Sequence, residues 1–171
     1  VDYMQTDYAD SNWNIITLPE NPENVVSENH TYWFRKDITI PQDLASDTSF
    51  TLQLCTIDGA DALWFNGTFV SQSSFNAELR SYDIPASLVN EGENNITLQL
   101  GFLKASGFFN ESGAIMELQS TTTPTNFVSV AGDWRFQQGI IFNNDNIVNN
   151  EYKITIMGSS TAQGWGATDN Y

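Results

Sequence analysis

The sequence has 171 residues, of which 40% are hydrophobic and 13% aromatic, so it can bury one well-formed core and is too apolar for a disordered chain. Its 21 acidic and 6 basic residues give a net charge of −15, which disfavours binding to nucleic acid or to an anionic membrane surface. No apolar stretch approaches the length of a transmembrane helix, and a single cysteine, Cys55, excludes an intrachain disulfide.

Alternation of apolar and polar residues predicts β-strands along most of the chain. In the segment from Thr31 to Ile40 one face carries Tyr32, Phe34, Ile38 and Ile40, and Pro41 ends the strand because proline cannot donate to a sheet ladder. Trp33 and Phe34 point to opposite faces, so at least one of them belongs to the core. Further strands are predicted at 50–54, 62–65, 96–102 and 114–118.

Turn signals separate these strands, and helical signals are short. Asn66-Gly67 is a strong hairpin signal, and single helical turns are predicted at 41–46 and 85–89. Many short strands joined by turns predict an all-β fold, a jelly-roll β-sandwich.

Towards the C-terminus the pattern changes. The polar segment 121–126 is typical of a short linker or an extended crossing strand, and 127–136 is expected to form a final strand pair around Ala131-Gly132-Asp133. An Asn-rich connector follows, and then a compact apolar strand at 153–157 that runs directly into Gly158-Ser159-Ser160.

Several motifs in order resemble the galactose-binding-like jelly rolls found beside glycoside hydrolases and in sialate O-acetylesterase-like proteins. They are Tyr32-Trp33-Phe34-Arg35-Lys36 with Ile40-Pro41, Ile57-Asp58-Gly59-Ala60-Asp61, Trp64-Phe65-Asn66-Gly67, Arg80-Ser81-Tyr82-Asp83-Ile84-Pro85, Gly92-Glu93-Asn94-Asn95-Ile96 and Ala131-Gly132-Asp133-Trp134. The resemblance covers roughly residues 10–137.

The segment from Ile154 to Gly164 resembles the first block of the SGNH (GDSL-type) hydrolases, in which an apolar strand ends in Gly-Asp-Ser and the serine opens a helix. The resemblance makes Ser160 the candidate nucleophile, although Ser159 replaces the usual aspartate. The acid, the base and the other oxyanion donors of that family are not in this sequence, so the triad is incomplete. An ordinary serine turn after a strand is the alternative.

The resemblances imply three parts: a jelly-roll module at 1–137, a connector at 138–152 and the start of a truncated SGNH domain at 153–171. A sugar site in such a module needs aromatic side chains beside polar groups in loops. The candidates are Trp13, His30, Phe75, Asn76, Phe108 and Phe109. A surface or hydrogen-bonded turn residue is the favoured alternative for His30, and the Phe108-Phe109 loop is at least as consistent with one folded back onto the core.

The expected function is a glycan-binding or glycan-positioning module of a secreted, periplasmic or cell-surface carbohydrate O-acetylesterase. Its expected partners are a polysaccharide or oligosaccharide and the remainder of the esterase domain. A purely structural or adhesive spacer, and an esterase fragment completed by a second chain, are the alternatives. No spaced set of metal ligands is evident, so no cofactor is expected, although scattered acidic loops permit the structural calcium ion common in related jelly rolls.

Overall fold

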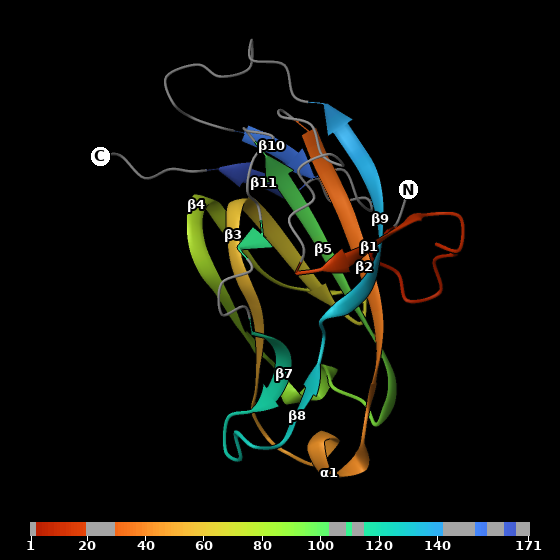
Figure 1. Ribbon diagram of the computed structural model, residues 1–171, viewed down its shortest axis with the longest axis vertical. Helices are drawn as coiled ribbons and strands as arrows, with labels where there is room; N and C mark the ends of the chain where they lie inside the picture. Colours follow the sequence, from red (N-terminus) through yellow and green to blue (C-terminus); the bar gives the residue numbers. More distant parts are fainter. Residues whose placement is uncertain are drawn as a thin grey trace.

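The computed structural model describes residues 3–19, 30–102, 109–110, 115–141, 153–156 and 163–166, and antiparallel β-sheet dominates it (Figure 1). The all-β jelly-roll fold class is thereby confirmed. The strands are β1 (Asn14–Leu18), β2 (His30–Ile40), β3 (Phe50–Phe65), β4 (Thr68–Ile84), β5 (Gly92–Phe102), β6 (Phe109–Asn110), β7 (Met116–Ser120), β8 (Phe127–Ser129), β9 (Gly132–Ile141), β10 (Lys153–Ile156) and β11 (Gln163–Gly166). The two predicted helical turns are present as α1 (Gln42–Ala45) and the 3-10 turn η1 (Ala86–Leu88), each directly after a proline.

The sheet curls because β3 changes its partner along its length. The strand order is β1-β9-β2-β5-β3-β7-β8, and β4 pairs with the other edge of β3. On the first edge, residues 50–54 of β3 pair with β7, whereas residues 60–65 pair with β5. Register shifts between Leu54 and Thr56 and between Gly59 and Asp61 mark the bend. Bulges of this kind increase strand twist and let one strand serve both layers of a sandwich.

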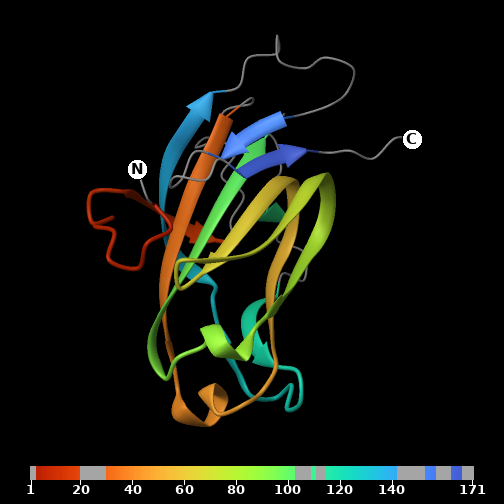
Figure 2. The same ribbon diagram turned by 180° about the vertical axis from the view of Figure 1, so that it is seen from behind.

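The main core lies between the two layers and is built from the inward faces of the alternating strands. Phe34 and Ile40 of β2, Leu63 and Phe65 of β3 and Leu98 of β5 are all at most 1% exposed. Burial of a large apolar side chain contributes roughly 1.5–3 kcal/mol, so each of these positions adds to the driving force for folding. In both views of the ribbon, the long β3–β4 hairpin lies on the opposite side of the molecule from β9 (Figures 1 and 2).

The predicted Asn66-Gly67 turn is confirmed and is tied to the start of β5. Asn66 and Gly67 both adopt positive φ, 48° and 77°, as a tight hairpin turn requires. The Asn66 amide Nδ2 donates to the Leu88 carbonyl at 2.8 Å and to Asn94 Oδ1 at 2.7 Å, while Asn66 Oδ1 accepts from the Asn95 backbone N–H at 2.7 Å. These bonds fix the relative position of two hairpins in the sandwich.

Two expectations about the C-terminal half were wrong. Segment 121–126 is the loop of the β7–β8 hairpin, where Ser120 Oγ accepts from the backbone N–H groups of Thr122 and Thr123. Strands β8 and β9 do not pair with each other: β8 pairs with β7, and β9 pairs with β1 and β2. The short connection at Val130 and Ala131 therefore crosses between layers, and buried Val130 belongs to the core.

Candidate functional site

A second apolar cluster covers the outer face of the layer formed by β2, β5 and β3. We call it the outer aromatic cluster; its buried members are Met4, Trp13, Trp33, Ala60, Ala62 and Trp64, and Tyr3 and Tyr8 pack against them. The indoles of Trp33 and Trp64 have ring centroids 5.5 Å apart, and the Tyr3 ring lies 5.2 Å from that of Trp13. Trp33 and Phe34 point to opposite faces of β2, so this strand contributes Phe34 to the main core and Trp33 to the outer aromatic cluster. The N-terminal segment 3–13 covers the outer aromatic cluster.

An ion-pair network attaches this N-terminal segment to the sheet. Arg35 of β2 is 2% exposed, and its Nε donates to Asp10 Oδ2 at 2.9 Å. Its Nη1 also donates to the Tyr3 carbonyl and, at 3.1 Å, to Thr97 Oγ1. Arg135 lies directly opposite Arg35 in the β2–β9 register, and its Nε is 3.3 Å from Asp10 Oδ1. One carboxylate thus neutralises two arginines that would otherwise repel each other across the strands.

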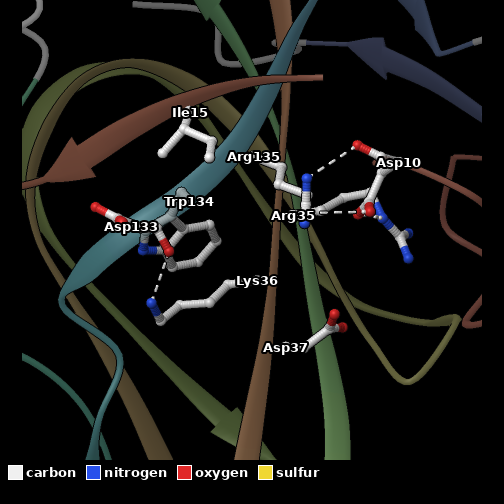
Figure 3. A pocket seen from close by; sticks show the side chains of 8 residues that line it. All are labelled: Asp10, Ile15, Arg35, Lys36, Asp37, Asp133, Trp134 and Arg135. Carbon is white, nitrogen blue, oxygen red and sulfur yellow. Dashed lines mark hydrogen bonds and ion pairs between the residues drawn. The ribbon is translucent and has the colours of Figure 1, made fainter. Parts of the chain in front are cut away.

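Beside this network lies a pocket of about 310 Å³ bounded by β1, β2, β9 and Asp10 (Figure 3). We call it the β1–β2–β9 pocket, and it is lined by Asp10, Ile15, Arg35, Lys36, Asp37, Asp133, Trp134 and Arg135. Three of the six basic residues of the chain therefore line one pocket of a protein whose net charge is −15.

Lys36 and Trp134 form one wall of the pocket. Lys36 Nζ donates to the Asp133 carbonyl at 2.8 Å and lies 5.9 Å from the centroid of the Trp134 ring. Burial lowers the pKa of Lys36, and the neighbouring Asp133 carboxylate opposes that change. The Trp134 indole is itself 1% exposed and donates through Nε1 to the Val130 carbonyl at 2.9 Å, so it supports the wall from the core side.

The exposed carboxylates of the pocket each keep one oxygen for a ligand. Asp37 Oδ1 accepts from Asn95 Nδ2 at 2.8 Å, and Asp133 Oδ1 accepts from Thr17 Oγ1 at 2.9 Å. In the described part of the chain, no hydrogen bond reaches the Oδ2 atom of Asp37 or of Asp133. The pocket therefore offers ammonium and guanidinium donors next to carboxylate acceptors.

The structure places the described residues among the expected sugar ligands on several different elements. Trp13 is buried in the outer aromatic cluster, and His30 begins β2, where it is half-buried with its ring 6.2 Å from that of Tyr32. Phe75 and Asn76 were expected in a loop, but they lie inside β4, because the β3–β4 hairpin is much longer than its alternation suggested. Phe109 lies in the short strand β6, which pairs with β3. Phe108 and Ser160 lie outside the described residues.

The sequence did contain a signal for the β1–β2–β9 pocket. Basic residues are scarce in this chain, yet Arg35-Lys36 lies in one of the short motifs that carry the jelly-roll resemblance, and Arg135 directly follows another. What the sequence did not show is that β2 and β9 are neighbours, which brings these motifs together.

The described residues contain no group of three or more His, Cys, Asp or Glu side chains that could hold a metal ion. Within the same residues no helix is long and apolar enough to cross a membrane.

The C-terminal strand β10 has a different neighbour from the one that the SGNH resemblance implies. Lys153–Ile156 forms a strand as predicted, but it pairs antiparallel with β11, so that Ile154 lies opposite Trp165 and Ile156 opposite Gln163. The SGNH resemblance instead requires a helix after the serine. Residues 163–166 are in strand rather than helix, and this part of the expectation was wrong.

Comparison with known proteins gives no matching family model and no matching curated protein. Solved structures do match. A β-glucuronidase from Bacteroides uniformis matches 78% of this chain with a TM-score of 0.52 and 18% identity. A glycosyl hydrolase family 2 (GH2) member from Bacteroides cellulosilyticus matches 63% of this chain with a TM-score of 0.51 and 21% identity. The chain spans only 15% and 16% of those two proteins. At these identities the likeness shows the fold alone, a β-sandwich.

Proposed function

We propose that the sandwich is a non-catalytic glycan-binding or glycan-positioning module of a secreted SGNH-type carbohydrate O-acetylesterase. The observation that carries this proposal is its structural likeness to β-sandwich portions of two glycoside hydrolases, each far longer than this chain. In this proposal the sandwich places or binds the glycan, and the chemical step belongs to the esterase part.

The esterase part of the proposal rests on the sequence that follows the sandwich. In the sequence, Gly158-Ser159-Ser160 follows the apolar segment 153–157, and the SGNH family carries its nucleophile at the corresponding place. In the proposed reaction, Ser160 Oγ attacks the acetyl carbonyl while a histidine accepts its proton, and the sugar hydroxyl leaves. Water then hydrolyses the acetyl-serine and releases acetate.

The chain itself supplies no such base. His30 is its single histidine, and it lies at the start of β2 within the sandwich. We therefore expect the 171-residue chain to leave p-nitrophenyl acetate unhydrolysed above background. Turnover by this chain that is lost in Ser160→Ala would show that a complete active site is present after all.

The glycan part is tested by affinity electrophoresis of the 171-residue chain in gels containing soluble polysaccharides. Retarded migration in at least one polysaccharide gel, relative to a non-binding protein of similar size and charge, is the expected result. Unchanged migration in all gels would favour the alternative of a structural spacer without a ligand.

A further inference from the structure

We propose that the β1–β2–β9 pocket binds a neutral sugar ring of a glycan through Lys36, Asp37, Asp133 and Arg135. This inference rests on the proposed function, because it names the ligand class of the module and the residues that recognise it. None of these four residues was among the sequence-based candidates.

The first argument is the arrangement of free donors and acceptors. Lys36 Nζ can donate three hydrogen bonds, and one of them goes to the Asp133 carbonyl. Arg135 has a 39% exposed side chain, and its contacts with Asp10 use Nε and Nη1 and leave Nη2 for a ligand. The pocket is also lined by Asp37 and Asp133, and in each of them one carboxylate oxygen carries no other hydrogen bond among the described residues.

This alternation of donors and acceptors matches a polyhydroxylated ring. Each sugar hydroxyl both donates and accepts, so a pair of neighbouring hydroxyls can donate to a carboxylate and accept from an ammonium or guanidinium group. Such charge-assisted hydrogen bonds are about twice as strong as neutral ones, which offsets the loss of water from the hydroxyls.

The second argument concerns charge and separates neutral from acidic sugars. The three cations of the pocket are matched by the three carboxylates Asp10, Asp37 and Asp133, so the pocket has no surplus positive charge. Asp10 already neutralises both arginines, and the whole chain carries a net charge of −15. The carboxylate of a uronic acid would therefore meet repulsion that a neutral ring avoids.

The third argument concerns size and the apolar face of the ring. The pocket volume of about 310 Å³ is at the lower end of the range of about 300–1,000 Å³ for small-molecule sites, as a site for one ring of a longer glycan should be. Ile15 lines the pocket and is 62% exposed, and it lies opposite Arg135 in the β1–β9 register. Its side chain offers an apolar surface to the C–H face of a sugar ring beside the polar groups (Figure 3).

The binding groups are held in place by their neighbours. Lys36, Asp37, Asp133 and Arg135 all stand on paired strands, and Trp134 and Asp10 hold two of the donors in place. Asp10 thereby acts as a positioning residue for Arg135. Groups held in position before binding lose little entropy when the ligand arrives.

The test is an NMR titration of the 171-residue chain with neutral trisaccharides (cellotriose, xylotriose and mannotriose) and with the acidic trisaccharide trigalacturonate. We expect at least one neutral trisaccharide to shift backbone amide signals of β1, β2 and β9, and trigalacturonate to bind more weakly. In Asp133→Ala and in Arg135→Gln the affinity should fall about tenfold or more, the effect of losing one hydrogen bond to a charged group.

Asp83→Ala is the matched control. Asp83 is exposed on β4, pairs with Thr51 in the other layer of the sandwich, and its loss changes the net charge by the same amount as the loss of Asp133. Its affinity should stay within about twofold of the original chain, since a distant exposed substitution has little effect. Urea unfolding of each variant separates loss of binding from loss of folding.

Three outcomes would overturn the inference. Stronger binding of trigalacturonate would show that the ligand is acidic. Binding that survives both pocket substitutions would place the sugar elsewhere, and the proposed glycan-binding function would then still stand. If no trisaccharide shifts any signal at the highest soluble concentration, the pocket is not a sugar site, and affinity electrophoresis alone then decides the proposed function.

Discussion

Asp61 of β3 and Arg80 of β4 form an ion pair inside the sandwich, with Arg80 Nε 2.5 Å from Asp61 Oδ1. Asp61 is fully buried and Arg80 is 3% exposed. The Tyr82 hydroxyl donates to the other carboxylate oxygen, and Arg80 Nη2 donates to the Gly59 carbonyl at 2.7 Å. Burial raises the pKa of Asp61, whereas Arg80 and Tyr82 lower it. Two donors on one carboxylate favour its charged form, so the bend of β3 is held by charges that water does not reach.

Removing either partner of this pair should destabilise the fold. Asp61→Asn and Arg80→Met are each expected to lower the free energy of unfolding by about 3–5 kcal/mol, because each leaves the other charge buried without compensation. The double variant Asp61→Asn with Arg80→Met should lose much less than the sum. Urea unfolding followed by tryptophan fluorescence measures all three, and Asp83→Asn on the exposed face of β4 is the control. Additive losses would show that the two charges are not coupled.

Asp10 should govern how firmly segment 3–13 is attached. Asp10→Asn removes the carboxylate shared by Arg35 and Arg135, and a loss of about 1–3 kcal/mol of stability is expected. Local opening should also expose the aromatic residues of the segment, so chymotrypsin should cleave after Tyr8 and Trp13 faster than in the original chain. Asp7→Asn, an exposed change in the same segment, should leave the cleavage rate unaltered. Equal cleavage of both variants would contradict this role.

Gly139 allows β9 to approach β2 closely. A Cβ at this position would lie 2.3 Å from Thr31 Oγ1 and 3.3 Å from the Thr31 carbonyl oxygen. Gly139→Ala should therefore cost about 1–3 kcal/mol through overpacking. Thr31→Ala removes the nearest atom, so the double variant should recover part of the loss in a double-mutant cycle of urea unfolding energies. Gln138→Ala, at an exposed position of the same strand, should have little effect. A Gly139→Ala variant as stable as the original chain would refute the close approach.

Cys55 should be unreactive in the folded protein. Its side chain is fully buried, and burial raises the pKa of its thiol from 9.0 to about 12. Since the thiolate is the reactive form, dithionitrobenzoate at pH 8 should modify Cys55 only after unfolding in urea. Rapid modification of the folded chain would contradict this burial.

The same pKa change predicts loss of stability in alkali. The unfolded thiol ionises near pH 9 and the folded one near 12, so the folded state retains the proton between these values. Stability that Cys55 contributes below pH 9 is therefore lost as the pH rises towards 12, by at most about 1.4 kcal/mol per pH unit. Burial also raises the pKa of Tyr82 above its usual 10.0, which acts in the same direction. The urea midpoint of Cys55→Ala should fall less steeply from pH 9 to 11; an equal slope would assign the loss to other groups.

Local patterns in the sequence determined most of the strands and turns. The 2.0 residue period and the turn chemistry of Asn66-Gly67 depend only on neighbouring residues. The strands predicted at 31–40, 96–102 and 114–118 therefore overlap β2, β5 and β7. The single helical turns after Pro41 and Pro85 follow from the same local rules. The fold class could therefore be predicted, since it depends on the number and kind of elements rather than on their order in the sheet.

The tertiary structure alone decided which strands are neighbours, and with that the candidate site. Trp13 is an aromatic residue of the kind that stacks against a sugar ring. Segment 3–13 nevertheless folds over β2 and β3, and Trp13 is buried there. Conversely, Arg35 and Arg135 are a hundred residues apart in sequence and lie opposite each other because β9 inserts between β1 and β2. Such pairings depend on hydrogen bonds and buried area formed between distant segments, and no local pattern encodes them. The sequence thus determined a jelly roll, and the packing of β1, β2 and β9 placed its charged pocket.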